Sequence, residues 1–190
     1  MKFEKNNPII FILCGKARSG KDTSSDFVRE YYEEKDEKVF NLQYAHHIKQ
    51  YVKGITDWDG TEKTKEPYRQ LMNYLGTEIV RDNLGKKFFL NRTLEDLFVY
   101  SHFYKIITIS DARFEWEIEA VREKYKNVVA IHIVRPNMDN NLTEEGKKHR
   151  VETGLDGYDN YDYKITNDGS LEELKEKIIN IVEEVDNNEY

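Results

Sequence analysis

Five short apolar segments, separated by longer stretches with helical periodicity, dominate the hydrophobic pattern of this chain. The segments cover residues 9–14, 38–44, 105–111, 128–134 and 163–166. Three of them contain the nearly continuous apolar runs FILC, IITIS and VVAIHIV, as expected for strands that are buried on both faces. Strands that alternate with helices indicate a parallel sheet covered on both sides. The pattern therefore predicts an α/β three-layer fold with a five-stranded parallel sheet.

Apolar residues at helical spacing predict the intervening helices. In residues 20–35 the buried face would comprise Phe27, Val28, Tyr31 and Tyr32. Residues 45–104 lack a strand pattern, and their apolar positions fall into two helical sets: Tyr68, Leu71, Met72, Leu75 and Ile79, then Leu90, Leu94, Leu97 and Phe98. This stretch is predicted to be a helical insertion within one domain that spans residues 1–190.

The final helix has the clearest start signal in the sequence. Ser170 and Glu173 have the spacing of a capping box, and the apolar stripe that follows consists of Leu171, Leu174, Ile178 and Val182. By contrast, residues 136–160 are polar and show no sustained period. They could form a simple loop or a mobile lid, and their length inside a compact domain favours the lid.

The segment GKARSGKDT, residues 15–23, follows the first predicted strand and opens the first predicted helix. Gly15 and Gly20 would let the backbone amides surround a phosphate, with Arg18 and Ser19 inside the loop and Lys21 supplying a cation. Asp22 stands where Ser or Thr is usual, and Thr23 comes one position later. The alternative interpretation is a glycine turn with a surface lysine.

Polar residues follow the other predicted strands. Because parallel strands end at the same edge of a sheet, these residues should meet in one crevice. Lys49 follows the second strand, Asp111 and Arg113 the third, Arg135 the fourth, and Asn167 and Asp168 the fifth. The cations among them, Lys49, Arg113 and Arg135, suit phosphoryl transfer, because the moving phosphoryl group needs positive charge around it. Asp111 could hold the water shell of Mg2+ or cap the next helix, and the same two roles are open for Asp22.

Within the insertion, Arg69, Asn73 and Thr77 recur every four residues and predict a polar stripe. It could be a solvated face, or Arg69 could contact a phosphate. The formal charge of −7 argues against a nucleic-acid or anionic-membrane partner. Cys14, the one cysteine, is expected to be a buried thiol rather than a nucleophile. With no signal peptide or spanning segment visible, the chain is expected in the cytoplasm.

Several motifs in one order carry a resemblance to a known family: GKARSGKDT, YRQLMNYLGTEIVRDNLG, ISDAR, IHIVRP, HRVE and ITNDGSLEEL. Together they resemble the phage deoxynucleoside monophosphate kinases, which are similar to animal phosphomevalonate kinase and more distantly to adenylate kinase. The resemblance implies a P-loop kinase that transfers the γ-phosphoryl of ATP, with Mg2+, to a deoxynucleoside monophosphate. The products would be the deoxynucleoside diphosphate and ADP.

The resemblance also implies roles for individual residues. Gly15, Gly20, Lys21 and Thr23 match the ATP loop, and Asn167, Asp168 and Gly169 match a turn beside adenine. Acceptor binding is implied for Lys49, Arg69, Gly76, Thr77, Asp111, Arg113, His149 and Glu152, with Asn73 beside them on the polar stripe. The predicted catalytic set is Lys21, Asp111, Arg113, Arg135 and Arg150, and Asp111 and Asp22 would contact Mg2+ through water.

Three departures from the family pattern and two rival functions accompany this interpretation. His47 replaces a proline, Val151 replaces a hydroxyl residue, and Arg150 occupies a variable position. The rivals are another small-molecule kinase, of the phosphomevalonate or dephospho-coenzyme A type, and a nucleotide-binding switch without an acceptor. The sequence leaves open which bases are accepted and is compatible with a homodimer.

Overall fold

The computed structural model describes residues 7–136 and 150–188. Its residue contacts divide the chain into two compact units. The first, here called the sheet unit, comprises Met1–Leu42 and Phe98–Tyr190, and the second, the helical unit, comprises Gln43–Leu97. The helical unit corresponds closely to the insertion predicted over residues 45–104. The assignment of residues 1–190 to one domain stays a prediction.

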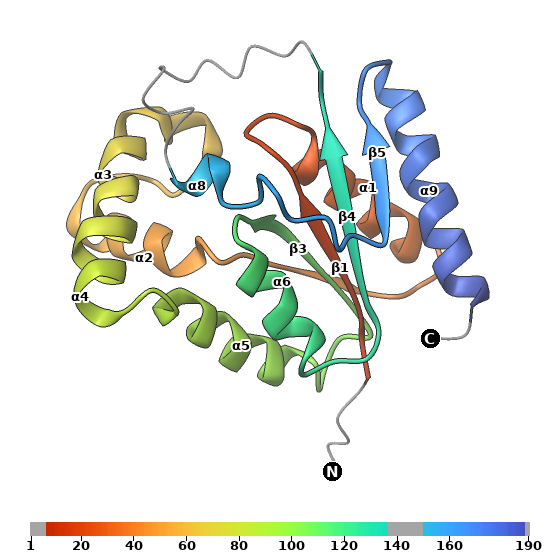
Figure 1. The fold of residues 1–190 in the computed structure, drawn as a ribbon, viewed down its shortest axis with the longest axis horizontal. Helices are drawn as coiled ribbons and strands as arrows, with labels where there is room; N and C mark the ends of the chain where they lie inside the picture. Colours follow the sequence, from red (N-terminus) through yellow and green to blue (C-terminus); the bar gives the residue numbers. More distant parts are fainter. Residues whose placement is uncertain (1–6, 137–149, 189–190) are drawn as a thin grey trace. The chain divides into compact units, whose positions relative to one another are not determined.

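The sheet unit is built on five parallel strands, as predicted (Figure 1). They are β1 (Ile9–Cys14), β2 (Val39–Leu42), β3 (Ile106–Ala112), β4 (Val128–Val134) and β5 (Tyr163–Thr166). The spatial order is β2-β3-β1-β4-β5, which puts β1 at the centre. β2 is shorter than the predicted 38–44, because the chain turns after Leu42 and enters the next helix at His46.

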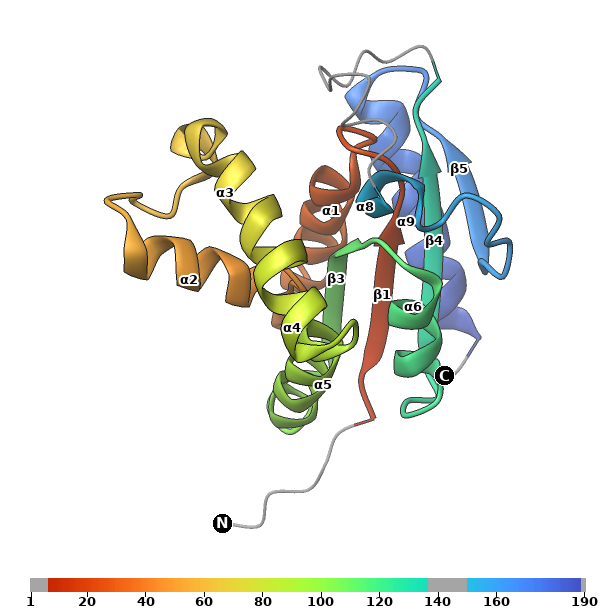
Figure 2. The same cartoon turned by 60° about the vertical axis from the view of Figure 1, so that its left-hand side comes forward.

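Helices cover both faces of this sheet. Figure 2 shows α1 (Lys21–Glu33) and α9 (Leu171–Asn187) on one face and α6 (Glu115–Arg122) on the other. The first face holds a continuous core, formed by alternate residues of β1 and β4 packed against α1 and α9. Each fully buried aliphatic side chain there contributes roughly 1.5–3 kcal/mol to folding. This layered core fixes the position of the β1–α1 loop.

The predicted helix faces are largely correct. Phe27, Val28 and Tyr32 are buried, whereas Tyr31 is only partly buried. Ser170 Oγ accepts a hydrogen bond from the Glu173 backbone N–H at 3.2 Å, which confirms the predicted start of α9. Leu171 was expected on the apolar stripe but is 56% exposed. It occupies the first position of α9, ahead of Leu174, the first residue of the helix to reach the core.

The helical unit contains a chain of short helices and one longer helix. In order they are α2 (His46–Ile55), the 3-10 helices η1 (Glu62–Thr64) and η2 (Glu66–Tyr68), α3 (Arg69–Tyr74), the π-helix η3 (Leu75–Arg81), α4 (Asp82–Leu84) and α5 (Phe88–Tyr100). α5 extends past the boundary into the sheet unit. Among the described residues, no helix is long and apolar enough to cross a membrane.

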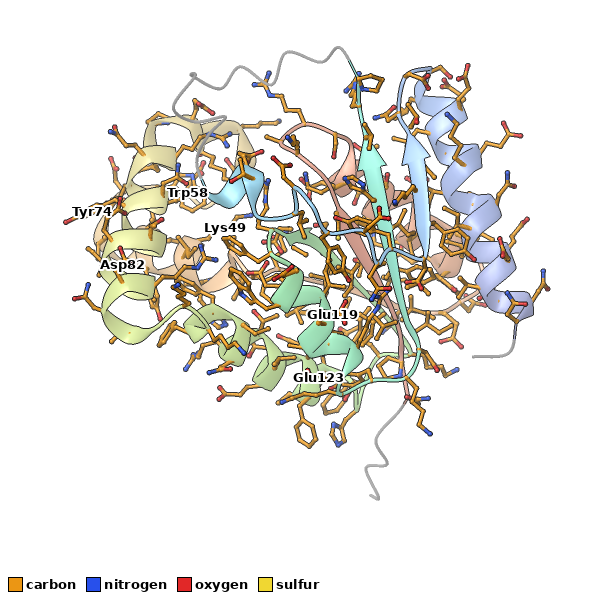
Figure 3. The ribbon with its side chains drawn as sticks, viewed as in Figure 1. Lys49, Trp58, Tyr74, Asp82, Glu119 and Glu123 are labelled. Atoms are coloured by element: carbon orange, nitrogen blue, oxygen red, sulfur yellow. The ribbon has the colours of Figure 1, made fainter. Side chains whose placement is uncertain are left out.

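Trp58, labelled in Figure 3, anchors a separate core inside the helical unit. Its indole N–H donates to Thr61 O at 3.2 Å and to Thr64 Oγ1 at 3.1 Å, while its ring packs with Val52, Met72 and Leu75. Ile79, predicted for the buried face, is 42% exposed. The π-helix causes this difference, because its wider turn shifts the phase of every side chain after Leu75. Phe98 in α5 is likewise exposed rather than buried.

Candidate phosphate-binding site

The loop between β1 and α1 has a backbone that requires glycine at both ends. Gly15 has φ 144° and Gly20 φ 107°, and between them Arg18 also has a positive φ of 61°. A Cβ at Gly15 would overlap the carbonyl oxygen of Ile133, and one at Gly20 would lie 2.7 Å from Asn167 Nδ2. The loop is therefore tightly curled against β4 and the β5–α9 turn, as a phosphate-binding loop requires.

Lys21 begins α1 and is almost completely buried, with 6% of its surface exposed. Its ammonium group donates to the carbonyl oxygen of Lys16 at 2.6 Å, across the loop. Burial, reinforced by the positive charge of Arg113, lowers the pKa of Lys21 to about 8. An incoming phosphate would reverse this effect, because a negative neighbour favours the charged ammonium.

The loop already holds an anionic group. The Ala17 backbone N–H donates to Oε2 of Glu152 at 3.0 Å, and Arg113 Nη1 donates to Oε1 of the same carboxylate at 2.9 Å. The side chains of Arg113 and Glu152 are only 24% and 12% exposed. Glu152 lies in the short helix α8 (Arg150–Thr153). The predicted residues Arg113 and Glu152 thus both lie at the loop, and at least one loop amide donates a hydrogen bond to a negatively charged oxygen.

Two hydroxyl residues of β3 fix α1 beneath the loop. Ser110 Oγ donates to Asp22 Oδ1 at 2.8 Å, and Ser25 Oγ lies 2.7 Å from Thr108 Oγ1. Sequence reasoning missed both partners, although Thr108 and Ser110 are the two polar positions, two residues apart, in IITIS. Asp22 is thus hydrogen-bonded to β3. Thr23 follows Asp22 and Asp111 follows Ser110, and both of these residues are half-buried. The pairing of β1 with β3 also shifts register between Ile12 and Cys14, directly before the loop.

The β5–α9 turn reaches the loop through Asn167. This buried side chain donates its amide N–H to the Ser19 carbonyl oxygen at 2.9 Å. Asp168 instead pairs with α9, where its Oδ1 lies 3.5 Å from the Nζ of Lys177. Ser19 is 3% exposed, and its hydroxyl finds no hydrogen-bond partner among the described residues. A buried hydroxyl of this kind fits a ligand oxygen, because leaving it unpaired carries a free-energy cost.

A cavity of about 520 Å³ opens from the loop within the sheet unit. The loop, the end of β4 and the segment after α8 line it, with Arg113, Arg135 and Glu152 among its residues. Arg135, predicted from its position after β4, is exposed and lies at this cavity. The volume falls in the range of small-molecule sites.

Five of the residues predicted to bind the acceptor belong to the helical unit: Lys49, Arg69, Asn73, Gly76 and Thr77. Several of them already have partners there. Lys49 donates to Gln43 Oε1 at 2.9 Å, and Arg69 pairs with Glu66 at 3.0 Å. A Cβ at Gly76 would lie 2.9 Å from Ile48 Cδ1, so this glycine allows α2 and η3 to pack closely. These contacts leave the role of the residues toward an acceptor a prediction.

Arg69, Asn73 and Thr77 do not form one exposed face, so the predicted polar stripe is wrong. Arg69 and Asn73 are exposed, but Thr77 is 7% exposed and its hydroxyl donates to the Asn73 carbonyl oxygen at 2.7 Å. The π-helix again shifts the phase. In the predicted lid, residues 137–149, including His149, and the side chains of Arg150 and Val151 lie outside the described residues.

Comparison with known proteins assigns the chain to a family. The family model described as deoxynucleotide monophosphate kinase matches residues 52–178. The chain belongs to the deoxynucleotide monophosphate kinase family. It is 35% identical over 127 residues to the deoxynucleotide monophosphate kinase of Enterobacteria phage T4, and 34% identical over 115 residues to that of Escherichia phage RB69. These matches cover 66% and 60% of the chain, but only 49% and 44% of the relatives.

This member of the deoxynucleotide monophosphate kinase family thus spans about half the length of the curated relatives it matches. Its fold is that of P-loop kinases. The APS kinase of Mycobacterium tuberculosis aligns with a TM-score of 0.55 at 11% identity, over 94% of this chain and 99% of that one. Thymidylate kinase from Ehrlichia chaffeensis aligns with a TM-score of 0.53 at 14% identity, over 93% of this chain and 99% of that one. The predicted P-loop three-layer fold is confirmed.

Proposed function

We propose that this chain transfers the γ-phosphoryl group of ATP to a deoxynucleoside monophosphate, giving the diphosphate and ADP. The observation that carries the proposal is the anionic Glu152 oxygen held by the Ala17 N–H, beside the buried ammonium of Lys21. A loop that holds a carboxylate oxygen in this way offers donors of the kind that phosphate oxygens need. Membership of the deoxynucleotide monophosphate kinase family supports the choice of acceptor.

Positive charge around the transferring group is the main contribution of the sheet unit. In the proposal, Lys21 neutralises the β- and γ-phosphates, while Arg113 stabilises charge on the phosphoryl group as it moves. Arg135 and Arg150 supply further positive charge from the end of β4 and from the lid. Phosphoryl transfer requires little covalent participation by the protein, so positioning and electrostatics suffice.

The residues around the loop fit a nucleotide and a magnesium ion that is held mainly by its substrates. The unpaired Ser19 hydroxyl lies in the loop, and Asn167, Asp168 and Gly169 form the turn proposed to border adenine. No group of three or more His, Cys, Asp or Glu side chains among the described residues could hold a metal by itself. Mg2+ would neutralise phosphate charge, and Asp111, Asp22 and Thr23 would contact it, the two carboxylates through water.

The acceptor is assigned to the helical unit and the lid. Lys49 and Arg69 are proposed to bind its phosphate. Further contacts are proposed from residues of α3 and η3, namely Asn73, Gly76 and Thr77, and from His149 and Glu152 in the lid. Residues 136–160 would close over the reaction and exclude water, because an accessible site would let ATP transfer its phosphoryl group to water.

Product analysis with purified protein tests the proposal. The protein is incubated with γ-labelled ATP, Mg2+ and each of the four deoxynucleoside monophosphates, and the nucleotides are separated. Label should appear in a deoxynucleoside diphosphate, and Lys21→Ala should abolish this transfer while the circular dichroism spectrum stays that of a folded α/β protein. Parallel incubations replace the monophosphate with dephospho-coenzyme A or phosphomevalonate, and label transferred to one of these compounds instead would refute the acceptor class. ATP binding without transfer to any acceptor would favour a nucleotide-binding switch.

A further inference from the structure

Glu152 uses both of its carboxylate oxygens on groups that a bound phosphate would need. One oxygen accepts from the Ala17 N–H of the phosphate loop, and the other accepts from Arg113. We propose that Glu152 is an internal competitor for the phosphate loop, and that a bound triphosphate displaces its carboxylate and thereby releases Arg113. This inference rests on the proposed function, because it takes the loop to be the binding site of a nucleotide.

Competition follows from the number of donors. A backbone N–H carries a single hydrogen, so a phosphoryl oxygen that bonds to Ala17 takes the place of Oε2. A phosphoryl group and the Glu152 carboxylate, held side by side at the loop, would also repel one another strongly, because the site is partly buried and the Glu152 side chain is only 12% exposed. The carboxylate must therefore leave when a phosphate occupies this position. Once it leaves, Arg113 loses its described partner and can donate to the phosphoryl group instead.

The chain beyond Glu152 is anchored independently of the phosphate loop. The hydroxyl of Tyr158 and the amide of Asn160 donate to Glu119 of α6, which is labelled in Figure 3. On the same helix, Arg122 donates to the Asn160 carbonyl oxygen at 2.7 Å and to Asp162 at 2.6 Å. These contacts hold residues 158–162 in place when Glu152 moves. Its release needs only a local movement of α8 and the residues that follow it.

Asp156 offers a matched control on the same segment. It pairs with Lys16 at 3.1 Å, but both side chains are more than half exposed, so this pair contributes little. Asp156→Asn and Glu152→Gln each remove one negative charge near the loop. Only Glu152→Gln removes the anion that occupies the Ala17 N–H. Comparing the two variants separates displacement from a general change in the electrostatic field.

Calorimetric titration with inorganic tripolyphosphate, and with adenosine as a ligand without phosphate, provides the test. Glu152→Gln should bind tripolyphosphate about tenfold more tightly than the natural chain, and Asp156→Asn less than about twofold more tightly. Neither change should alter the adenosine titration. Without ligand, Glu152→Gln should also lower the melting temperature by about 2–4 °C, because it weakens an ion pair and a hydrogen bond.

Tighter tripolyphosphate binding together with a lower melting temperature distinguishes a competitor from a merely structural residue. A structural role predicts lower thermal stability with unchanged or weaker tripolyphosphate binding, and that result would overturn the inference. An equal gain in Glu152→Gln and Asp156→Asn would overturn it as well. Glu152→Asp keeps the charge but shortens the side chain, so it should give a gain of about threefold and covers the case in which the glutamine variant misfolds. If neither the natural chain nor any variant binds tripolyphosphate or ATP, the proposed function itself is wrong.

Discussion

The depressed pKa of Lys21 makes a sharp prediction about the pH dependence of nucleotide binding. Burial and Arg113 lower this pKa from 10.5 to about 8 in the ligand-free chain. A bound polyphosphate favours the charged ammonium, so the complex retains the proton to higher pH. Binding must therefore take up a proton wherever the free chain has lost it, and affinity must fall as the pH rises through the pKa of Lys21.

The magnitude follows from that pKa. With a pKa of about 8, Lys21 is about nine-tenths protonated at pH 7 and about one-tenth at pH 9, so the affinity for ATP should drop about tenfold between these values, or ~1.4 kcal/mol. With the ordinary lysine pKa of 10.5, the change over the same range would be only a few per cent. The expected uptake at pH 8 is about half a proton for each ATP bound.

Isothermal titration at pH 7, 8 and 9, in buffers with different ionisation enthalpies, measures both the affinity and the protons taken up. Lys21→Arg is the matched control, because a guanidinium stays charged throughout this range, so its binding of ATP, even if weaker, should not fall as the pH rises. The last ionisation of ATP acts in the opposite direction, since it makes the ligand more negative. Flat affinity and no proton uptake in the natural chain, or an equal pH dependence in Lys21→Arg, would refute the reasoning.

Substitutions at three further positions test the structure. Gly15→Ala should lower the free energy of unfolding by at least about 2 kcal/mol and abolish tripolyphosphate binding, because the new Cβ overlaps Ile133 O at a φ of 144°; a loss below about 0.5 kcal/mol in urea denaturation would contradict the tight loop. Asp36→Gly should raise the free energy of unfolding by about 0.5–1 kcal/mol, because Asp36 has φ 59° just after α1, whereas Asp36→Val should lower it. Ile131→Ala, in the fully buried centre of β4, should cost about 2–5 kcal/mol in the same assay, and a cost near that of a surface change would contradict its place in the core.

Local sequence signals were enough to predict the sheet and the phosphate loop. Continuous apolar runs identified the strands because residues buried on both faces leave no polar alternation, and the two glycines identified a loop whose backbone other residues cannot adopt. The shared edge of parallel strands correctly placed Arg113 and Asn167 at this loop. Each of these inferences depends on a few neighbouring residues or on a general rule of topology.

Features that depend on tertiary contacts or on an irregular helix could not be predicted in this way. The π-helix over Leu75–Arg81 shifts the side chains, so that Thr77 is buried and Ile79 exposed, and no residue of LGTEIVR signals it. The contact between Ala17 and Glu152 joins residues 135 positions apart, and its geometry depends on how α8 lies against the loop. A motif match placed Glu152 in the site, but it could not show which donors the carboxylate would occupy.

The buried position of Cys14 gives this chain a built-in reporter of its own opening. The thiol is inaccessible at the end of β1, and burial raises its pKa to about 12, so almost no reactive thiolate is present in the folded protein. It is also the one cysteine in the sequence. An alkylating reagent can therefore modify only molecules in which the central strand has come away from its neighbours. The labelling rate of the natural protein, without any engineered cysteine, measures how often the strand that leads into the phosphate loop is released, and whether nucleotides slow that event.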